Sequence, residues 1–438
     1  MGKSENDITK TIEESDFLKT FSSSFYKKVL NESLVSYKKK ISKIEAKKSI
    51  IEAYRNLISY NYNVSTPQEY IYLTKNKYVA RIIPVFTIQD EAIYFYLCKQ
   101  IEDDISKNRV DGTFGGWRIG NSIKVLEDEE LEYVINSYDP SLWLKNWKDF
   151  QKYIYTNLEM YNYKYALKID IANFYDSIDI NLLSRKLYRS CKKEKYEVVE
   201  LIIYLLKYWN KKYNNYNENN VGIPQNEFGD QSRLLANLYL NDYDISMEKI
   251  CDDNDCKYSR FADDQIILFN EDEEINNIML VCNEELRKLG LNLNVGKVIK
   301  FTHDEIIDFY LFKQLEKLDL KLYDEAVTEF FSLVDSNKKV RSDTFLRRCL
   351  TIGLDKFSEF NRNRIVSIIT KEDFIINCGF QHLSAIYKNL DKEDKIKFLE
   401  NLFDLYKKIK FNGFRYVVIT FAKKNNLKEF FNICINNL

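Results

Sequence analysis

Three aspartates in two segments of the chain have the side chains that metal-dependent chemistry needs. Asp170 lies in the apolar stretch 165–171, and Asp263 is followed directly by Asp264 between two apolar stretches. Adjacent carboxylates repel each other, and a bound divalent cation supplies the missing countercharge. Mg²⁺ prefers hard oxygen ligands and shares its coordination shell with substrate phosphates. Because two such ions about 3.5–4 Å apart promote phosphoryl transfer, the aspartates predict a site for two Mg²⁺ ions, with Mn²⁺ as a substitute.

Each of these aspartates also has a simpler interpretation as a turn residue. An Asp-Asp pair alone is usually a solvated turn, and a lone Asp at the end of a strand is usually a turn residue as well. A third segment favours the chemical interpretation, because GIPQ at 222–225, with Ser232 and a helix behind it, lies between the two aspartate segments. The order and separation of the three segments, rather than any one aspartate, predict a catalytic site.

The catalytic candidates lie at the ends of predicted strands. Residues 165–171 form a strong strand candidate, and 257–269 reads as two short strands joined through Asp263 and Asp264. Apolar residues recur at helical spacing between and after these strands. That spacing predicts helices at 181–190, 194–213, 230–250 and 272–289, followed by a short strand at 291–293.

The chain on either side of this region has a different pattern of apolar and polar residues. Residues 1–65 and 344–438 read as helices separated by polar breaks, and the second range is compatible with an α-solenoid of stacked helix pairs. Two short strands are expected around the polar turn at 74–77, and the charged stretch 313–343 reads as a linker. The glycine-rich segment 111–121 is either a structural loop or a contact for a nucleotide or nucleic acid.

Composition describes a folded protein and argues mildly against a nucleic-acid enzyme. The 438 residues are 45% hydrophobic and 30% charged, which is usual for a globular chain. The formal net charge is −1, whereas nucleic-acid enzymes are often basic, although a basic groove can coexist with an acidic exterior. No apolar run approaches the roughly 20 residues of a transmembrane helix, and the eight cysteines show no regular spacing. We therefore expect a cytoplasmic protein without membrane contact.

The three segments resemble the successive palm motifs of reverse transcriptases. The matching stretches are DIANFYDSI at 170–178, GIPQ with the downstream LANLYL, and FADD at 261–264. The segment 75–90, with its arginine and proline, is similar to the preceding fingers motif, and LRKLGLNLNVGK at 286–297 is similar to the motif that follows.

The resemblance spans residues 66–312 and implies an α+β fold of the right-hand fingers–palm type. A helical N-terminal extension, 1–65, would precede it. An all-helical C-terminal domain, 313–438, would replace the thumb, and its helices would form a HEAT-like solenoid.

The resemblance also implies a role for each matched residue. Asp170 and Asp263 would be the principal metal ligands, with Asp264 as the third carboxylate and the backbone of Ile171 also facing a metal. Tyr175 matches the bulky residue that excludes a 2′-hydroxyl and so selects deoxynucleotides. Gln225 would contact the incoming nucleotide or the template, and Arg81 with Lys75 or Lys77 would hold the triphosphate. Lys297 would act on the departing pyrophosphate, although it is equally compatible with a surface lysine.

Several positions depart from the usual family pattern. Asn226 stands where glycine is usual, Arg233 stands where proline is usual, and 308–312 lacks the glycine of the primer-grip hairpin. No recognisable thumb, maturase segment or ribonuclease H carboxylate set follows. These departures resemble the abortive-infection reverse transcriptases of the AbiK and AbiA type, in which a helical-repeat region replaces the thumb.

This second resemblance implies a mode of action. Such enzymes are bacterial antiphage proteins that form homo-oligomers and polymerise dNTPs in protein-primed, template-independent DNA synthesis. The DNA product would be attached covalently through a tyrosine hydroxyl. Among the 32 tyrosines the sequence singles out none, and Tyr26 and Tyr37 are N-terminal candidates.

Two other functions stay open. A conventional RNA-templated reverse transcriptase, such as a retron or defence-associated enzyme, would account for the fingers motif and Gln225, and would depend on an added template. A non-catalytic nucleic-acid-binding scaffold would account for the net charge of −1 and the helical C-terminal part, but a degenerate site would be expected to lose the three aspartates. Incorporation of deoxynucleotides without a template separates the first two hypotheses.

Overall fold

In a computed structural model, the chain forms two compact units. The structure describes residues 14–21, 23–38, 41–119, 122–125, 131–134, 141–211, 220–227 and 229–438. Unit 1 comprises Met1–Glu32, Ile41–Glu69 and Pro84–His303, and unit 2 comprises Ser33–Lys40, Tyr70–Ile83 and Asp304–Leu438. Each unit takes in segments that are distant in sequence, and the predicted three-part division by chain order stays a prediction.

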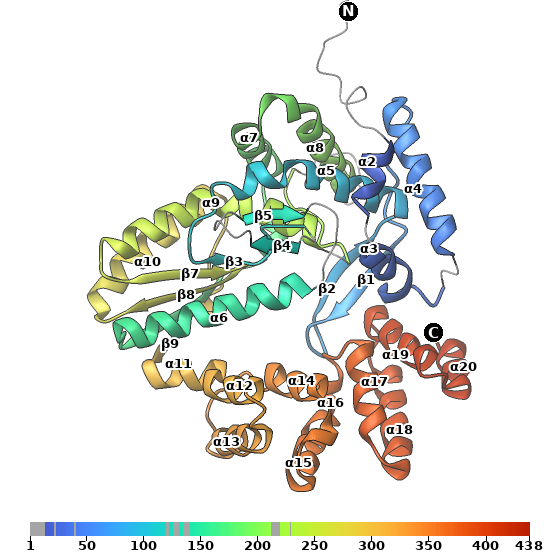
Figure 1. Cartoon of the computed structure of the whole chain (residues 1–438), viewed down its shortest axis with the longest axis vertical. Coiled ribbons are helices and arrows are strands. Elements are labelled where there is room, and N and C mark those ends of the chain that lie inside the picture. The colour runs from blue at the N-terminus through green and yellow to red at the C-terminus, as the bar shows by residue number, and fades with distance from the viewer. Residues whose placement is uncertain are drawn as a thin grey trace, which may run out of the picture. The chain divides into compact units, whose positions relative to one another are not determined.

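The centre of unit 1 is a five-stranded sheet with strand order β3-β7-β8-β6-β9 (Figure 1). Its strands are β3 (Thr113–Phe114), β6 (Tyr165–Asp170), β7 (Lys257–Phe261), β8 (Asp264–Phe269) and β9 (Ile299–Thr302). Neighbouring strands are antiparallel except for β3 and β7, which are parallel. The predicted strands at 165–171 and 257–269 are thus confirmed.

Helices cover both faces of this sheet. On one face, Trp147 and Phe150 of α6 (Ser141–Tyr161) contact the ring of Phe261, with centroid separations of 5.0 and 5.7 Å. On the other face, α9 (Asp230–Asp252) packs on β7 and α10 (Asp272–Lys288) packs on β8 (Figure 1). Because side chains alternate along a strand, Phe261 and Arg260 point to opposite faces of the sheet.

The other helices of unit 1 pack around α5 and share one hydrophobic core with the sheet. The helix α5 begins after Thr87, whose side chain accepts a hydrogen bond from the Asp90 N–H and so caps the first turn. The helices are α2 (Glu14–Lys19), α3 (Ser23–Lys27), the π-helical turn Lys28–Glu32, α4 (Lys43–Ile58), α5 (Ile88–Ser106), α7 (Ile180–Ser190) and α8 (Tyr196–Lys211). A separate antiparallel pair is formed by β4 (Ser122–Val125) and β5 (Leu131–Val134).

Unit 2 combines a β-hairpin with the C-terminal helices. The strands β1 (Glu69–Thr74) and β2 (Ala80–Val85), most of whose residues belong to unit 2, pair with each other. The side chain of Asn412 donates to the Tyr70 carbonyl (2.8 Å) and accepts from the Tyr72 N–H (2.7 Å), so it satisfies backbone groups along one edge of β1. The helices are α11 (His303–Tyr310), α12 (Phe312–Asp319), α13 (Tyr323–Asp335), α14 (Ser342–Ile352), α15 (Glu359–Ile369), α16 (Glu372–Ile375), α17 (Phe380–Asn389), α18 (Lys392–Lys408), α19 (Asn412–Lys424) and α20 (Lys428–Asn436).

Two local predictions differ from the structure. The stretch 313–343 is helical rather than a linker, because its charged residues lie on the exposed sides of α12 and α13 while Leu318 and Phe330 are buried. The predicted strand at 291–293 is reduced to a single bridge between Ile171 and Leu293, and the sheet edge is β9 instead. The predicted HEAT-like solenoid stays a prediction.

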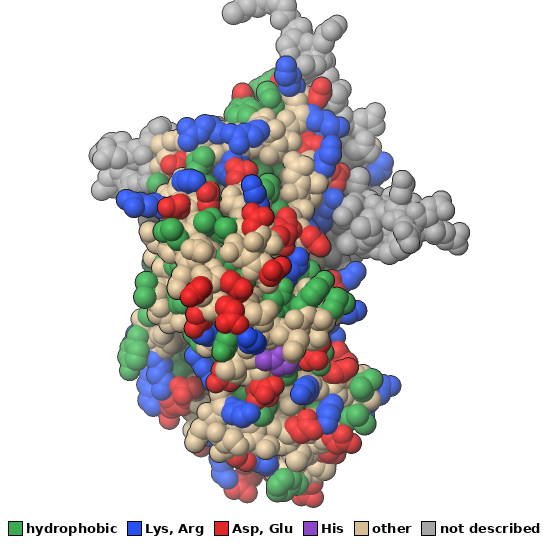
Figure 2. Space-filling view, turned by 90° about the vertical axis from the view of Figure 1, so that its left-hand side faces the viewer, with side chains coloured by type: hydrophobic (Ala, Val, Ile, Leu, Met, Phe, Trp, Pro, Cys, Tyr) green, Lys and Arg blue, Asp and Glu red, His purple; other side chains and the backbone are tan. Residues whose placement is uncertain are grey.

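Charge and cysteine chemistry agree with the composition. Figure 2 shows acidic and basic side chains together on the face that it draws. All eight cysteines are buried and carry free thiols. Within the part of the chain that the structure describes, no helix has the length and apolar character to cross a bilayer.

Candidate active site

The three aspartates predicted from sequence meet at one end of the central strands of the unit 1 sheet. Asp170 is the last residue of β6 and lies opposite Asp264, the first residue of β8. Asp263 occupies the two-residue turn between β7 and β8, and its carbonyl accepts a hydrogen bond from the Ile171 N–H at 3.4 Å. Directly opposed residues of antiparallel strands have Cβ atoms about 4.5–5.5 Å apart, so the register brings these carboxylates within reach of shared ligands.

Two lysines and one asparagine neutralise or hold these carboxylates. The Lys297 Nζ lies 2.9 Å from Oδ2 of Asp170. The Asn294 side-chain amide donates to the same oxygen at 3.2 Å, and the Asn294 N–H donates to the Asp170 carbonyl at 2.8 Å. Lys168, two residues before Asp170 on β6, forms an ion pair with Asp264. The segment after α10 and the strand β6 therefore both place a cation at the aspartates.

The electrostatic balance of the site is unfavourable for Asp263. Burial raises the pKa of Asp263, and the charges of Asp264 and Asp170 raise it further, against a smaller lowering by Lys297. For Lys297, burial lowers the pKa, but the hydrogen bond to Asp170 and the surrounding carboxylates outweigh that effect and raise it overall. Lys297 is therefore held in its protonated form beside a site that has an excess of negative charge.

The carboxylates at this end of the strands are suitable ligands for a divalent cation. Asp170, Asp263 and Asp264 offer hard carboxylate oxygens, and the raised pKa of Asp263 shows that these charges lack full compensation. In the described part of the chain, no group of three His, Cys, Asp or Glu side chains is arranged so that it could hold a metal ion. Asp170 and Asp264 instead pair with Lys297 and Lys168, so metal binding would require these ion pairs to open.

Tyr175 and the segment that carries Gln225 lie side by side. The Ile223 N–H donates to the Tyr175 carbonyl at 2.9 Å, and the Gly222 N–H donates to the Ile178 carbonyl at 2.7 Å. Gly222 has a φ of +101°, a conformation that favours glycine, because a Cβ there would be strained and would meet the Asp176 carbonyl at 3.3 Å. The Gln225 Oε1 atom is buried and makes no hydrogen bond.

Asn226, which stands where the family usually has glycine, anchors the same segment. Its amide donates to both carboxylate oxygens of Glu91 at 2.8 and 3.0 Å, and its Oδ1 accepts from the Gly229 N–H at 2.9 Å. Gln231 donates to the same Glu91 carboxylate at 2.8 Å. The departure at Asn226 therefore has a structural reason, since glycine would leave Glu91 with fewer donors.

The three basic residues predicted to bind the triphosphate belong to the hairpin of unit 2. Lys75 and Arg81 are exposed, and the Lys75 N–H donates to the Val79 carbonyl at 2.8 Å to close the turn. Lys77 forms ion pairs with Glu372 and Asp373, at 3.0 and 3.8 Å. Their assignment to triphosphate binding stays a prediction.

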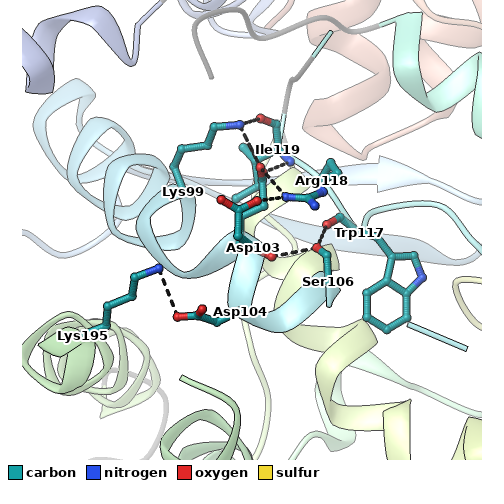
Figure 3. A network of polar contacts seen from close by, with 9 residues as sticks. Lys99, Asp103, Asp104, Ser106, Trp117, Arg118, Ile119 and Lys195 are labelled. Carbon is teal, nitrogen blue, oxygen red and sulfur yellow. Dashed lines mark hydrogen bonds and ion pairs between the residues drawn. The ribbon is translucent and has the colours of Figure 1, made fainter. Parts of the chain in front are cut away.

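The glycine-rich segment, described up to residue 119, is a structural loop. Figure 3 shows Lys99 and Ser106 pointing toward it from α5. The Lys99 Nζ donates to the Ile119 carbonyl at 2.7 Å, and the Ser106 hydroxyl donates to the Trp117 carbonyl at 2.5 Å. The Ile119 N–H donates to the buried carboxylate of Glu102 at 2.5 Å. These contacts satisfy the loop backbone from within the protein and favour the structural interpretation over a nucleotide contact.

Four residues of the site were not predicted from sequence. Lys168 and Asn294 contact the aspartates, and Arg260 and Asp244 form a fully buried ion pair directly behind the turn. The alternation along β6 offered one signal, because a lysine two residues before Asp170 shares its face of the strand. Asp244 lay in a helix of mixed composition, and only the fold shows that it faces Arg260.

Comparison with known families settles the class of the protein. The family model described as "Reverse transcriptase (RNA-dependent DNA polymerase)" matches residues 105–341, a range that contains all three aspartates. The chain belongs to the reverse transcriptase family. The predicted enzyme class, a nucleotidyltransferase, and the predicted fingers–palm type of fold are thereby confirmed, and divalent metal ions are what reverse transcriptases generally use.

Individual relatives of this reverse transcriptase are distant. The Retron Ec83 reverse transcriptase of Escherichia coli is 31% identical over 112 residues, which are 24% of this chain and 33% of that relative. The chain thus matches about a third of that relative's length.

Solved structures are more distant still. The telomerases of Candida albicans and Candida tropicalis are 11% and 10% identical, with TM-scores of 0.36 and 0.35. The alignments cover 86% and 87% of this chain and 65% and 66% of those telomerases.

Proposed function

We propose that this reverse transcriptase joins deoxynucleotides into DNA at the site formed by Asp170, Asp263 and Asp264. The observation that carries the proposal is the strand register that sets Asp170 opposite Asp264, with Asp263 in the adjoining turn. These three carboxylates, with the backbone of Ile171, would hold two Mg²⁺ ions, or Mn²⁺ in their place. When bound, the ions supply activation of the attacking hydroxyl and stabilisation of the leaving pyrophosphate.

The chain's own residues have separate tasks in this reaction. Lys297, protonated beside Asp170, would give a proton to the departing pyrophosphate. The backbone of Tyr175 is hydrogen-bonded to the segment that carries Gln225, and its ring would clash with a 2′-hydroxyl, which selects deoxynucleotides. Gln225 has a buried amide oxygen without a partner, which suits a contact to the incoming nucleotide or to the template. Arg81 and Lys75 would hold the triphosphate.

For the mode of synthesis we propose protein priming without a template, in a homo-oligomer that acts in bacterial antiphage defence by abortive infection. The departures at Asn226 and Arg233 and the helical C-terminal region support this mode. Of the two N-terminal candidates, Tyr26 is buried, with an exposed fraction of 6%. Among the described tyrosines, Tyr78 and Tyr60 are far more accessible, at 87% and 73%.

A second candidate is RNA-templated synthesis of the retron kind. The similarity to the Retron Ec83 reverse transcriptase supports it, because that relative is a reverse transcriptase of a retron. In this case the enzyme would depend on an RNA template and a primer, and Gln225 would contact the template.

The test is incubation of the purified protein with Mg²⁺ and labelled deoxynucleotides, without template or primer, followed by denaturing electrophoresis. Label that migrates with the protein until protease treatment supports protein priming. Incorporation only after addition of RNA and a primer supports the templated mode.

Two variants make this test specific for the site. Asp263→Ala/Asp264→Ala should abolish incorporation, whereas Asp272→Asn, an exposed acid that pairs with Lys300, should leave it unchanged. Incorporation by the double alanine variant at the wild-type level would show that the carboxylates are not catalytic and that the scaffold hypothesis has to be taken up again.

A further inference from the structure

The turn that carries Asp263 has an unfavourable backbone conformation. It consists of two residues between Phe261 and Asp264, which are paired in the ladder. Its first residue, Ala262, has a φ of +55°. Two-residue hairpin turns with positive φ at the first position normally use glycine, asparagine or aspartate there rather than alanine. A residue with a Cβ keeps such a conformation only where its surroundings impose it, so some neighbouring group must hold this turn.

Arg260 is the group that holds the turn from behind. Its Nη1 donates to the Ala262 carbonyl at 2.8 Å and to Oδ1 of Asn237 at 2.9 Å. Its Nε and Nη2 donate to the two carboxylate oxygens of Asp244 at 2.7 and 2.5 Å. Arg260 and Asp244 both have 0% side-chain exposure. A bidentate ion pair thereby fixes the plane of the guanidinium, and this orientation directs Nη1 toward the Ala262 carbonyl.

The orientation of Arg260 is fixed by further contacts on the same face of the sheet. The Tyr258 hydroxyl donates to Oδ1 of Asp244 at 2.8 Å, and the Asn237 amide donates to the Gly115 carbonyl at 2.6 Å. The Arg260 N–H donates to the Gly112 carbonyl at 3.0 Å. The glycine-rich loop, α9 and the catalytic hairpin are therefore joined through one buried arginine.

We propose that Arg260 is a positioning residue that sets the direction of the Asp263 carboxylate through the carbonyl of Ala262. The inference deepens the proposed function and rests on the catalytic role of Asp263. Arg260 lies on the face of β7 opposite to Phe261 and touches none of the three aspartates that would bind metal. Its effect reaches the site only through the backbone of the turn.

A purely structural role predicts a different outcome. If Arg260 served only as the countercharge of Asp244, then removal of both charges would leave stability and activity close to those of the wild type. The reason is that a buried ion pair can be replaced by neutral side chains without loss. If Arg260 holds the turn, the same double replacement leaves stability close to that of the wild type but leaves the Asp263 carboxylate misplaced. The double variant therefore separates the two roles.

The experiment compares the wild type with Arg260→Met/Asp244→Asn and with Arg260→Lys. Three quantities are measured: the melting temperature, the Mg²⁺ concentration at the midpoint of thermal stabilisation, and kcat and KM for deoxynucleotides. We expect the double variant to be folded, with kcat lowered by about tenfold to a hundredfold and KM nearly unchanged, because a small displacement of a reacting group has effects of this size. The Mg²⁺ midpoint should rise several-fold.

Arg260→Lys keeps a positive charge beside Asp244 and serves as the second variant if the double variant does not fold. Lysine has no planar fork and cannot bind Asp244 in a bidentate manner while also reaching the Ala262 carbonyl. We expect a near-normal melting temperature with the same loss of kcat and the same rise in the Mg²⁺ midpoint. Wild-type values of both quantities in either folded variant would overturn the proposal.

Asp263→Asn distinguishes this inference from the proposed function on which it rests. If Asp263→Asn incorporates nucleotides as the wild type does, then the assignment of the catalytic site is wrong. If Asp263→Asn is inactive while the Arg260 variants are fully active, only the positioning role is wrong.

Discussion

At the scale of single residues, the site is a balance between three carboxylates and two lysines. Lys297 pairs with Asp170 and Lys168 pairs with Asp264, while Asp263 has its pKa raised by burial and by the other two charges. In the metal-free protein, the negative charge of Asp263 is therefore energetically unfavourable. Binding of a divalent cation would relieve it.

The first prediction concerns Asp263→Asn. A carboxyl whose pKa is raised in the folded state lowers stability as the pH rises above the usual carboxyl pKa, so near neutral pH the wild type carries this penalty. We expect Asp263→Asn to raise the melting temperature of the metal-free protein by about 2–5 °C and to remove most of the stabilisation by Mg²⁺. Thermal melts with and without Mg²⁺ measure both effects, and Asp272→Asn is the exposed control. A lower melting temperature for the variant in the absence of metal would refute the repulsion argument.

The second prediction concerns sugar selection by Tyr175. Tyr175→Val removes the ring that would meet a 2′-hydroxyl, so we expect the ratio of kcat/KM for ribonucleotides to that for deoxynucleotides to rise by at least about tenfold. Tyr175→Phe keeps the ring and should keep the wild-type ratio. Single-nucleotide incorporation assays give both numbers. Equal ratios for the valine and phenylalanine variants would show that Tyr175 does not face the sugar.

At the scale of elements, the segment with Gln225 is fastened to α5 and α9 by polar contacts. Glu91 of α5 accepts from Asn226 and Gln231, and the Ser232 hydroxyl donates to the Pro224 carbonyl at 2.5 Å. Burial raises the pKa of Glu91 to about 7, although the donors and nearby Lys28 lower it. The charge state of one buried carboxyl is thus coupled to the segment beside Tyr175.

The third prediction follows from the sign of that shift. The unfolded chain loses the Glu91 proton near pH 4.5 and the folded chain near pH 7, so wild-type stability falls as the pH rises through this window. We expect the unfolding free energy of the wild type, relative to Glu91→Gln, to fall by up to about 3 kcal/mol between pH 4.5 and 8. Urea unfolding at several pH values measures this difference, with Glu52→Gln as the exposed control. Parallel pH profiles for wild type and Glu91→Gln would contradict the prediction.

At the scale of the whole molecule, two hydrophobic cores support two compact units. The core of unit 1 surrounds the catalytic sheet, and the core of unit 2 lies among the C-terminal helices. In unit 2, the ring of Phe345 is fully buried and stacks on Phe330 with a centroid separation of 4.4 Å. A core that is complete within each unit allows each to unfold on its own.

The fourth prediction is that Phe345→Ala lowers the stability of unit 2 alone. Removal of a buried phenyl ring costs about 3–5 kcal/mol, so calorimetry should show one transition moved to lower temperature. A second transition, which Mg²⁺ stabilises, should stay in place because the aspartates belong to unit 1. A single transition that moves as a whole would show that the two units unfold cooperatively.

Much of the palm could be predicted from local pattern. The strands around Asp170 and around Asp263-Asp264 have strong β composition and sharp ends, and the long helices α9 and α10 have clear apolar spacing. The strand β9 was missed because it has only four residues and takes its place through pairing with β6. The linker prediction at 313–343 failed because charged residues dominate stretches whose few apolar residues all turn inward.

By itself, the sequence determined the chemical class of the site, because three aspartates in motifs of fixed order are local features that need no knowledge of distant contacts. Only the tertiary structure decided what surrounds them: Lys168 in an ion pair with Asp264, Asn226 hydrogen-bonded to Glu91, and Arg260 behind the turn with Asp244. The first two pairs join elements that are far apart in the chain, whereas Arg260 and Asp244 lie on the consecutive elements β7 and α9. Their pairing depends on strand register and on which helix face turns inward, and both are set by burial of the whole core rather than by neighbours in sequence.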